Sequence, residues 1–102
     1  GLGDVYKRQM HQDPEVLNYR VRGMMPRLRP GMVLAVEPML TSGDIENVTE
    51  NDDWTVRTVD GSDAAQWEHT IAILDDGVAI LSAIDGGVAG LAPFGVTPVL
   101  LD

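Results

Sequence analysis

A run of largely apolar residues begins directly after a turn signal. Pro30-Gly31 is followed by Met32-Val-Leu-Ala-Val-Glu-Pro-Met-Leu40, in which Glu37 is the only charged residue. Short apolar runs rich in branched side chains and introduced by Pro and Gly are typical of buried β-strands. We therefore predict a buried central strand over residues 32–40, followed by a polar loop over residues 41–53.

Further strands are predicted where apolar and polar residues alternate. Asp60-Gly61-Ser62 and Asp75-Asp76-Gly77 both have the residue types of tight turns. Each separates two stretches of strand-like pattern, so the middle of the chain is expected to be antiparallel β. A Gly-, Ala-, Val- and Pro-rich tail over residues 84–102 has no period and is expected to be irregular. The predicted strands in this part of the chain span residues 54–59, 65–74 and 78–82.

Length and composition indicate one small globular domain. The chain has 102 residues, 44% of them hydrophobic, and no cysteine. The lack of cysteine agrees with a cytoplasmic location, and the sequence shows neither a membrane-spanning run nor a signal peptide. Sixteen acidic residues against seven basic ones give a net charge of -9. This charge disfavours nucleic acids and anionic membranes as partners, although six of the seven basic residues precede Pro30, as in a solvated arginine-bearing loop.

Two glutamates occupy positions where charged side chains are unexpected. Glu37 interrupts an apolar strand, and burying an ionised carboxylate is costly unless it is paired or bound to metal. A strand that ends at Pro38 would instead leave Glu37 at the rim of the sheet. Glu68 lies in a second predicted strand, where alternation places it on the opposite face from His69. Two inward-facing carboxylates would form half of a site for Mn, Fe, Co or Zn. His69 is expected to be a hydrogen-bonded core residue or a support for a ligand, and a direct metal ligand is the alternative.

A histidine near the start of the chain is a further candidate for chemistry. His11 lies in Met10-His-Gln-Asp-Pro14. Because imidazole titrates near neutral pH, His11 could donate a hydrogen bond to a substrate or transfer a proton. A loop histidine without function is the alternative that composition alone leaves open.

Several stretches, in order along the chain, resemble successive motifs of the type I methionine aminopeptidases. The most specific are Glu37-Pro38-Met39 after an apolar strand and Gln66-Trp-Glu-His-Thr70 within one. Xaa-Pro dipeptidases, which share the fold, typically have Glu-Pro-Gly at the first place, so the match favours the methionine branch. The other matching stretches are residues 10–19, residues 28–36, residues 53–59 and Asp60-Gly-Ser62.

The resemblance implies a role for each candidate residue. Glu37 matches a glutamate that binds one of two divalent metal ions (Co, Mn, Fe or Zn) and helps to activate the attacking water, and Glu68 matches the glutamate that bridges both ions. His11 matches a histidine that contacts the substrate carbonyl and stabilises the tetrahedral intermediate. Met10 and Trp54 match positions beside the substrate's methionine side chain. The implied activity is removal of the initiator methionine from nascent proteins by a monomeric enzyme.

The implied fold is α+β, as part of a pita-bread fold, mainly the antiparallel sheet of its C-terminal half. The family uses five metal ligands, of which only Glu37 and Glu68 are recognisable here; a histidine in a His-Gly-Ile-Gly motif and two aspartates are not. Residues 1–9 do not match the family and are expected to be a non-native leader, residues 10–83 the matching half, and residues 84–102 the tail. We expect this 102-residue chain alone to bind metal weakly and to lack peptidase activity.

Two other functions are compatible with the residues. A non-catalytic binding domain of the same fold would be expected to lose the ligand glutamates, whereas Glu37 and Glu68 are both present. An acidic all-β interaction module would carry both glutamates on its surface. Whether the Glu37 and Glu68 carboxylates converge in the structure distinguishes this last interpretation from a metal site.

Overall fold

The computed structural model describes residues 13–102, which divide into two compact units. One unit contains the described residues up to Val36 together with His69–Asp102, and the other contains Glu37–Glu68. The strands are antiparallel throughout both units, as the sequence predicted. No helix among residues 13–102 is long and apolar enough to cross a membrane.

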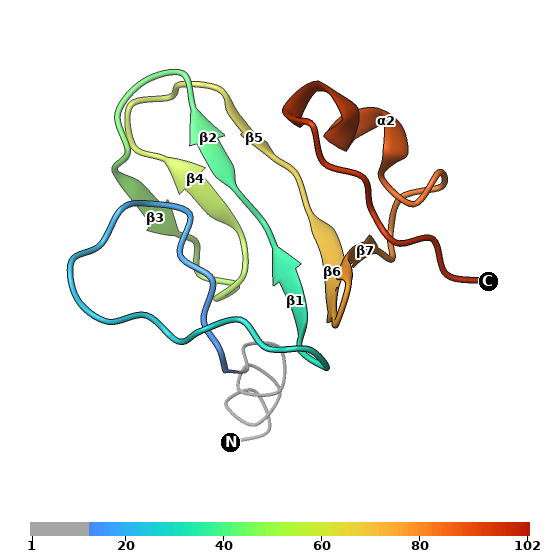
Figure 1. Cartoon of the computed structure of the whole chain (residues 1–102). Helices are drawn as coiled ribbons and strands as arrows, with labels where there is room; N and C mark the ends of the chain where they lie inside the picture. The colour runs from blue at the N-terminus through green and yellow to red at the C-terminus, as the bar shows by residue number, and fades with distance from the viewer. Residues whose placement is uncertain (1–12) are drawn as a thin grey trace. The chain divides into compact units, whose positions relative to one another are not determined.

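The first unit is built on a three-stranded antiparallel sheet (Figure 1). Its strands are β1 (Val33–Val36), β6 (His69–Leu74) and β7 (Gly77–Ile80), with β6 between the other two. The turn at Asp75 and Asp76 joins β6 to β7, and Gly77 has the positive φ of 152° that a side chain would resist. The hairpin predicted from Asp75-Asp76-Gly77 is therefore confirmed.

Few apolar side chains are buried in this sheet. Leu34, Ala72 and Ala79 are the buried hydrophobic residues of the described chain. Residues 14–17, Met25, Pro26 and Leu28 line, with Leu34 and Ile71 of the sheet, an apolar hollow of about 360 Å³. The predicted central strand over residues 32–40 is wrong in one respect, because β1 lies at the edge of its sheet and Val33 is 59% exposed.

The C-terminal segment contains short helices where the sequence suggested an irregular tail. These are α2 (Val88–Leu91) and η1 (Ala92–Phe94). Asp85 makes the turn into α2 possible, since its two carboxylate oxygens accept hydrogen bonds from the N–H groups of Gly87 and Ala89, each at 2.9 Å. These hydrogen bonds just before the helix carry no hydrophobic period, which explains why the sequence pattern did not predict it.

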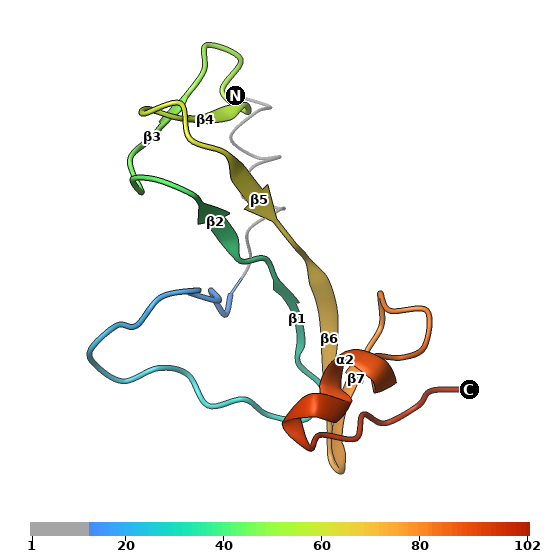
Figure 2. The ribbon, with the colours of Figure 1, turned by 90° about the horizontal axis from the view of Figure 1, so that it is seen from above.

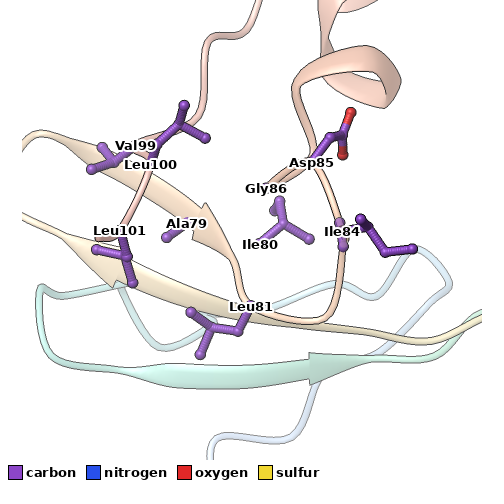
Figure 3. Close-up of a pocket in the computed structure, with 10 residues that line it drawn as sticks. Ala79, Ile80, Leu81, Ile84, Asp85, Gly86, Val99, Leu100 and Leu101 are labelled. Atoms are coloured by element: carbon purple, nitrogen blue, oxygen red, sulfur yellow. The ribbon is translucent and has the colours of Figure 1, made fainter.

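After these helices the chain returns to the sheet. The Val99 N–H donates to the carbonyl of Val78 in β7 at 2.7 Å. Figure 3 shows Val99, Leu100 and Leu101 beside Ala79 and Leu81, with the carboxylate of Asp85 toward the short helix. The hollow of about 390 Å³ between them contains none of the predicted site residues.

The second unit consists of two antiparallel strand pairs, labelled in Figure 2. One pair is β2 (Met39–Thr41) with β5 (Ala64–Gln66), and the other is β3 (Asn47–Thr49) with β4 (Val56–Thr58). Strand β3 lies in the segment that the sequence predicted to be a polar loop. Its residues are all exposed, so no apolar face marks it as a strand in the sequence.

Both long strands predicted from the sequence are interrupted. The run over residues 32–40 is divided into β1 and β2 at Glu37-Pro38, and the run over residues 65–74 is divided into β5 and β6 at Trp67-Glu68. Proline has no N–H for a strand ladder, which accounts for the break at Pro38. The two interruptions contain the two candidate metal ligands.

Candidate metal site

Continuing the pairing of β2 with β5 beyond its last assigned residues sets the backbone of Glu37 opposite that of Glu68. In the β2–β5 pair, Met39 lies opposite Gln66, and beyond it the Trp67 N–H donates to the carbonyl of Pro38 at 3.2 Å. One further step along this register places Glu37 opposite Glu68. Directly opposed residues in an antiparallel ladder have Cβ atoms about 4.5–5.5 Å apart and share a face. The backbone pairing therefore brings together two residues that are 31 positions apart in sequence.

The environments of the two glutamates differ. Glu37 is half-buried and engaged in an interaction within the chain, whereas Glu68 is exposed. Glu37 also directly follows the end of β1, as the rim alternative required. Glu37 therefore lies at the end of a strand, and the continued register places its backbone opposite that of Glu68. The acidic surface-module interpretation places both glutamates on the surface, and the exposed Glu68 agrees with it, whereas the half-buried Glu37 agrees with it less well.

The neighbouring histidine is held by a serine from the other end of the hairpin. His69 is half-buried at the start of β6, and its Nδ1 lies 2.8 Å from Ser82 Oγ. The same Oγ accepts a hydrogen bond from the Thr70 N–H at 3.0 Å. The prediction that His69 is a hydrogen-bonded residue is confirmed. Ser82 was missed by sequence reasoning because its only signal was a polar residue at the end of an apolar strand.

The substrate-side candidates are less constrained by the structure. Met10 and His11 lie outside the described residues. Trp54 lies in the second unit, 63% exposed, in a turn where its N–H donates to Asp52 Oδ1 at 3.0 Å. Its predicted place beside a methionine side chain remains a prediction.

A carboxylate clamp orders the loop after β2. Asp60 accepts hydrogen bonds from the N–H of Asp44 at 2.8 Å and from the N–H of Ser62 at 2.9 Å. The Ser62 hydroxyl and these two N–H groups lower the pKa of Asp60 to about 2. Gly43 is required beside this clamp, since a Cβ there would collide with the Asp60 carboxylate. The Asp60-Gly61-Ser62 turn signal was visible in the sequence, but its long-range partner Asp44 was not.

Two carboxylates at opposed backbone positions suit a divalent cation as part of a ligand set. Carboxylate oxygens bind Mn, Fe, Co and Zn, and two like charges in facing positions favour a cation between them. Within residues 13–102, no group of three or more His, Cys, Asp or Glu side chains is placed to hold a metal ion. The described donors therefore fit a metal as a pair, to which a complete site would add others.

Comparison with known proteins supports one family. No protein-family model matches the chain. It is 55% identical over 75 residues to methionine aminopeptidase 1 of Mycobacterium tuberculosis, covering 74% of this chain and 28% of the relative. It is 53% identical over 81 residues to a methionine aminopeptidase of Clostridium acetobutylicum, covering 79% of this chain and 32% of the relative. The chain thus spans about a third or less of the curated relatives it matches.

Solved structures give the same result for the fold. The methionine aminopeptidase of Thermotoga maritima superposes with a TM-score of 0.65 and 48% identity, over 72% of this chain and 29% of that one. The enzyme of Rickettsia prowazekii gives a TM-score of 0.66 and 40% identity, over 72% of this chain and 30% of that one. The antiparallel strands described above are therefore a part of the pita-bread fold. The matching region corresponds to less than a third of the length of either enzyme. The chain belongs to the type I methionine aminopeptidase family.

Proposed function

We propose that Glu37 and Glu68 are metal ligands of a site that hydrolyses the bond after an N-terminal methionine. The observation that carries this proposal is the register of β2 and β5, which leads to Glu37 facing Glu68. The family names of the relatives supply the reaction, and the two carboxylates supply the chemistry that such a reaction needs. The finer roles, with Glu37 on one ion and Glu68 bridging two, follow from the resemblance and are part of the proposal.

The chain's own residues have defined tasks in this proposal. Glu37 and Glu68 neutralise part of the charge of divalent ions and fix their position against the sheet. When bound, such ions polarise a peptide carbonyl and activate water as a nucleophile. The half-buried position of Glu37 limits its conformational freedom, and a ligand that is already ordered loses less entropy when it binds.

The substrates in this proposal are peptides and nascent proteins that begin with methionine. His11 would contact the substrate carbonyl as a hydrogen-bond donor, and Met10 and Trp54 would line the place of the methionine side chain, where apolar and polarisable groups are favourable. These roles rest on the matching sequence positions. A cytoplasmic location, where new proteins are made, agrees with this substrate class.

The 102-residue chain by itself is expected to bind metal weakly and to release no methionine. Its described residues offer a ligand pair instead of a full set, so Mn²⁺ binding should be weak. A peptide such as Met-Ala-Ser tests the second expectation. Methionine release by the purified chain that is abolished by Glu68→Gln would contradict it.

Metal titration tests the ligand assignment directly. Mn²⁺ binding to the purified chain is followed by water-proton relaxation for the wild type, Glu37→Gln and Glu68→Gln. Each variant should weaken binding at least tenfold, because each removes a charged oxygen donor. Glu46→Gln is the matched control, since it removes an exposed glutamate of the same unit. Equal effects of all three substitutions, or no Mn²⁺ binding by the wild type, would reject the assignment.

Activity requires a second experiment in a complete enzyme. The matching segment of Mycobacterium tuberculosis methionine aminopeptidase 1, which is 55% identical, can be replaced by residues of this chain. The chimera should release methionine, and Glu68→Gln should abolish release, whereas Glu46→Gln should leave it unchanged. A folded, metal-loaded chimera without activity would show that this segment no longer supports the reaction.

A further inference from the structure

Strand β7 lies at one end of the sheet order β1-β6-β7. Beyond its last residue, the Leu81 N–H donates to the carbonyl of Thr70 at 2.8 Å, so Leu81 and, by alternation, Ala79 pair with β6. The backbone groups of Val78 and Ile80 therefore point away from β6, toward the edge of the sheet. Such an edge is a template on which another strand can pair.

The sequence of β7 gives this edge little protection of its own. Natural edge strands typically carry Lys, Pro or an inward-pointing charge, which discourage pairing with another chain. The stretch Gly77-Val-Ala-Ile-Leu81 has no charged residue and no proline, and its Val and Ile are strong strand formers. Without a cover, an uncharged strand of this kind pairs readily with a second copy of itself.

The segment after η1 covers the β7 edge. The Val99 N–H donates to the carbonyl of Val78 at 2.7 Å and so uses an acceptor that points outward from the sheet. Val99 and Leu100 lie beside Ala79 (Figure 3), which is only 2% exposed although it belongs to an edge strand. Pro98, just before Val99, is buried and has no N–H with which to extend the pairing further.

The turn after β7 is shaped to receive this segment. A Cβ on Gly86 would lie 2.6 Å from Leu100 Cδ2, so the backbone of the turn and the Leu100 side chain are in close contact. Asp85 holds the same turn, because its carboxylate accepts hydrogen bonds from the N–H groups of Gly87 and Ala89. Residues 98–101 are therefore seated against an ordered part of the first unit.

We propose that residues 98–101 guard the β7 edge and prevent the chain from pairing with a second copy through it. The partner at an uncovered edge would be β7 of another molecule. Two identical antiparallel strands can pair about a two-fold axis, which uses the same outward groups on both copies and closes the assembly as a dimer. The guard acts within the first unit and is independent of the metal site.

The test breaks the guard in the full chain by Val99→Pro, which removes the N–H that donates to Val78. Val99→Ala is the matched control, because it shortens the side chain and keeps the N–H. Sedimentation velocity over a range of concentrations measures the self-association of each protein. Val99→Pro should associate about tenfold more tightly than the wild type, since a two-fold pairing forms its backbone hydrogen bonds in symmetric pairs, and Val99→Ala should resemble the wild type.

A second substitution locates the surface through which the variant associates. Ile80→Pro removes an outward N–H and places a ring in the path of a partner strand, while it leaves the pairing with β6 intact. Added to Val99→Pro, it should return association to the wild-type level. Strand β1, the other edge of this sheet, is the same in every variant, so pairing through β1 does not contribute to the differences.

Three results would overturn the proposal. The first is equal association of Val99→Pro and the wild type, and the second is association that Ile80→Pro does not reduce. The third is read in the wild type itself, where hydrogen exchange of the Val99 amide should be slowed by its hydrogen bond to Val78. Exchange at the rate of an unstructured peptide would show that the guard is not in place, even if Val99→Pro failed to fold.

Discussion

Truncation of Leu34 tests whether the small core of the first unit stabilises its sheet. Leu34 is 8% exposed in β1 and lies opposite Ile71 of β6, whereas its neighbour Val33 is 59% exposed. Leu34→Ala removes three carbon atoms from the buried side of the sheet. Val33→Thr is the matched control, because it changes an adjacent exposed residue and keeps the branched Cβ that strands favour.

The expected magnitude follows from the burial of Leu34. At about 0.8 kcal/mol per buried methylene, the lost transfer free energy is roughly 2.4 kcal/mol, and residual burial in the unfolded chain lowers it by roughly 10–40%. The added cavity cost should be small, because Leu34 already lines an open hollow together with residues 14–17 and Met25. We expect the free energy of unfolding to fall by about 2 kcal/mol, a change of about 30-fold in the unfolding equilibrium.

Native-state hydrogen exchange of the β6 amides is the appropriate measurement. Ile73 reports the β1–β6 pairing, because its N–H donates to the carbonyl of Met32 at 2.8 Å. Tryptophan fluorescence is unsuitable here, since Trp54 and Trp67 both belong to the other unit. Leu34→Ala should lower the protection of Ile73 about 30-fold, and Val33→Thr should change the free energy by less than about 0.5 kcal/mol. Similar protection in both variants would refute the reasoning that this core stabilises the sheet.

Two further predictions concern the Asp60 clamp and its glycine. The pKa of Asp60 is lowered to about 2 from its ordinary 3.8, so the contribution of the Asp60 carboxylate to stability is fully present above pH 4 and is lost as the pH falls toward 2. The Asp44 amide resonance should therefore titrate near pH 2 in the wild type. A titration that persists in Asp60→Asn would show that the Asp60 carboxylate is not its cause. Gly43→Ala should lower the urea midpoint of the second unit, followed by Trp54 fluorescence, because the new Cβ meets Asp60 and comes within 2.8 Å of the Ser62 Cβ. Gly90→Ala is its control, with no heavy atom within 4 Å of the new Cβ, and an equal loss in both variants would show that steric conflict is not the cause.

Local chemistry was sufficient to predict part of this fold. The Asp75-Asp76-Gly77 hairpin could be recognised because a tight turn depends on the conformations of its own few residues, and Gly77 has the positive φ that the turn uses. The same local reasoning could not find β3. Its residues Asn47–Thr49 are exposed, and they form a strand through backbone pairing with Val56–Thr58. Because this pairing is made by backbone groups, the identities of the residues say little about where it forms.

The candidate site shows the same division. By itself, the sequence determined that Glu37 and Glu68 were unusual, because a charge within an apolar run is costly whatever surrounds it, and the order of motifs determined the family. Only the tertiary structure decided the register between β2 and β5, whose continuation sets the backbones of the two glutamates opposite each other. It also decided that Ser82 contacts His69 and Thr70. Strand register and side-chain contacts involve residues that are distant in sequence. The pattern of apolar and polar residues within one strand does not identify the strand with which it will pair.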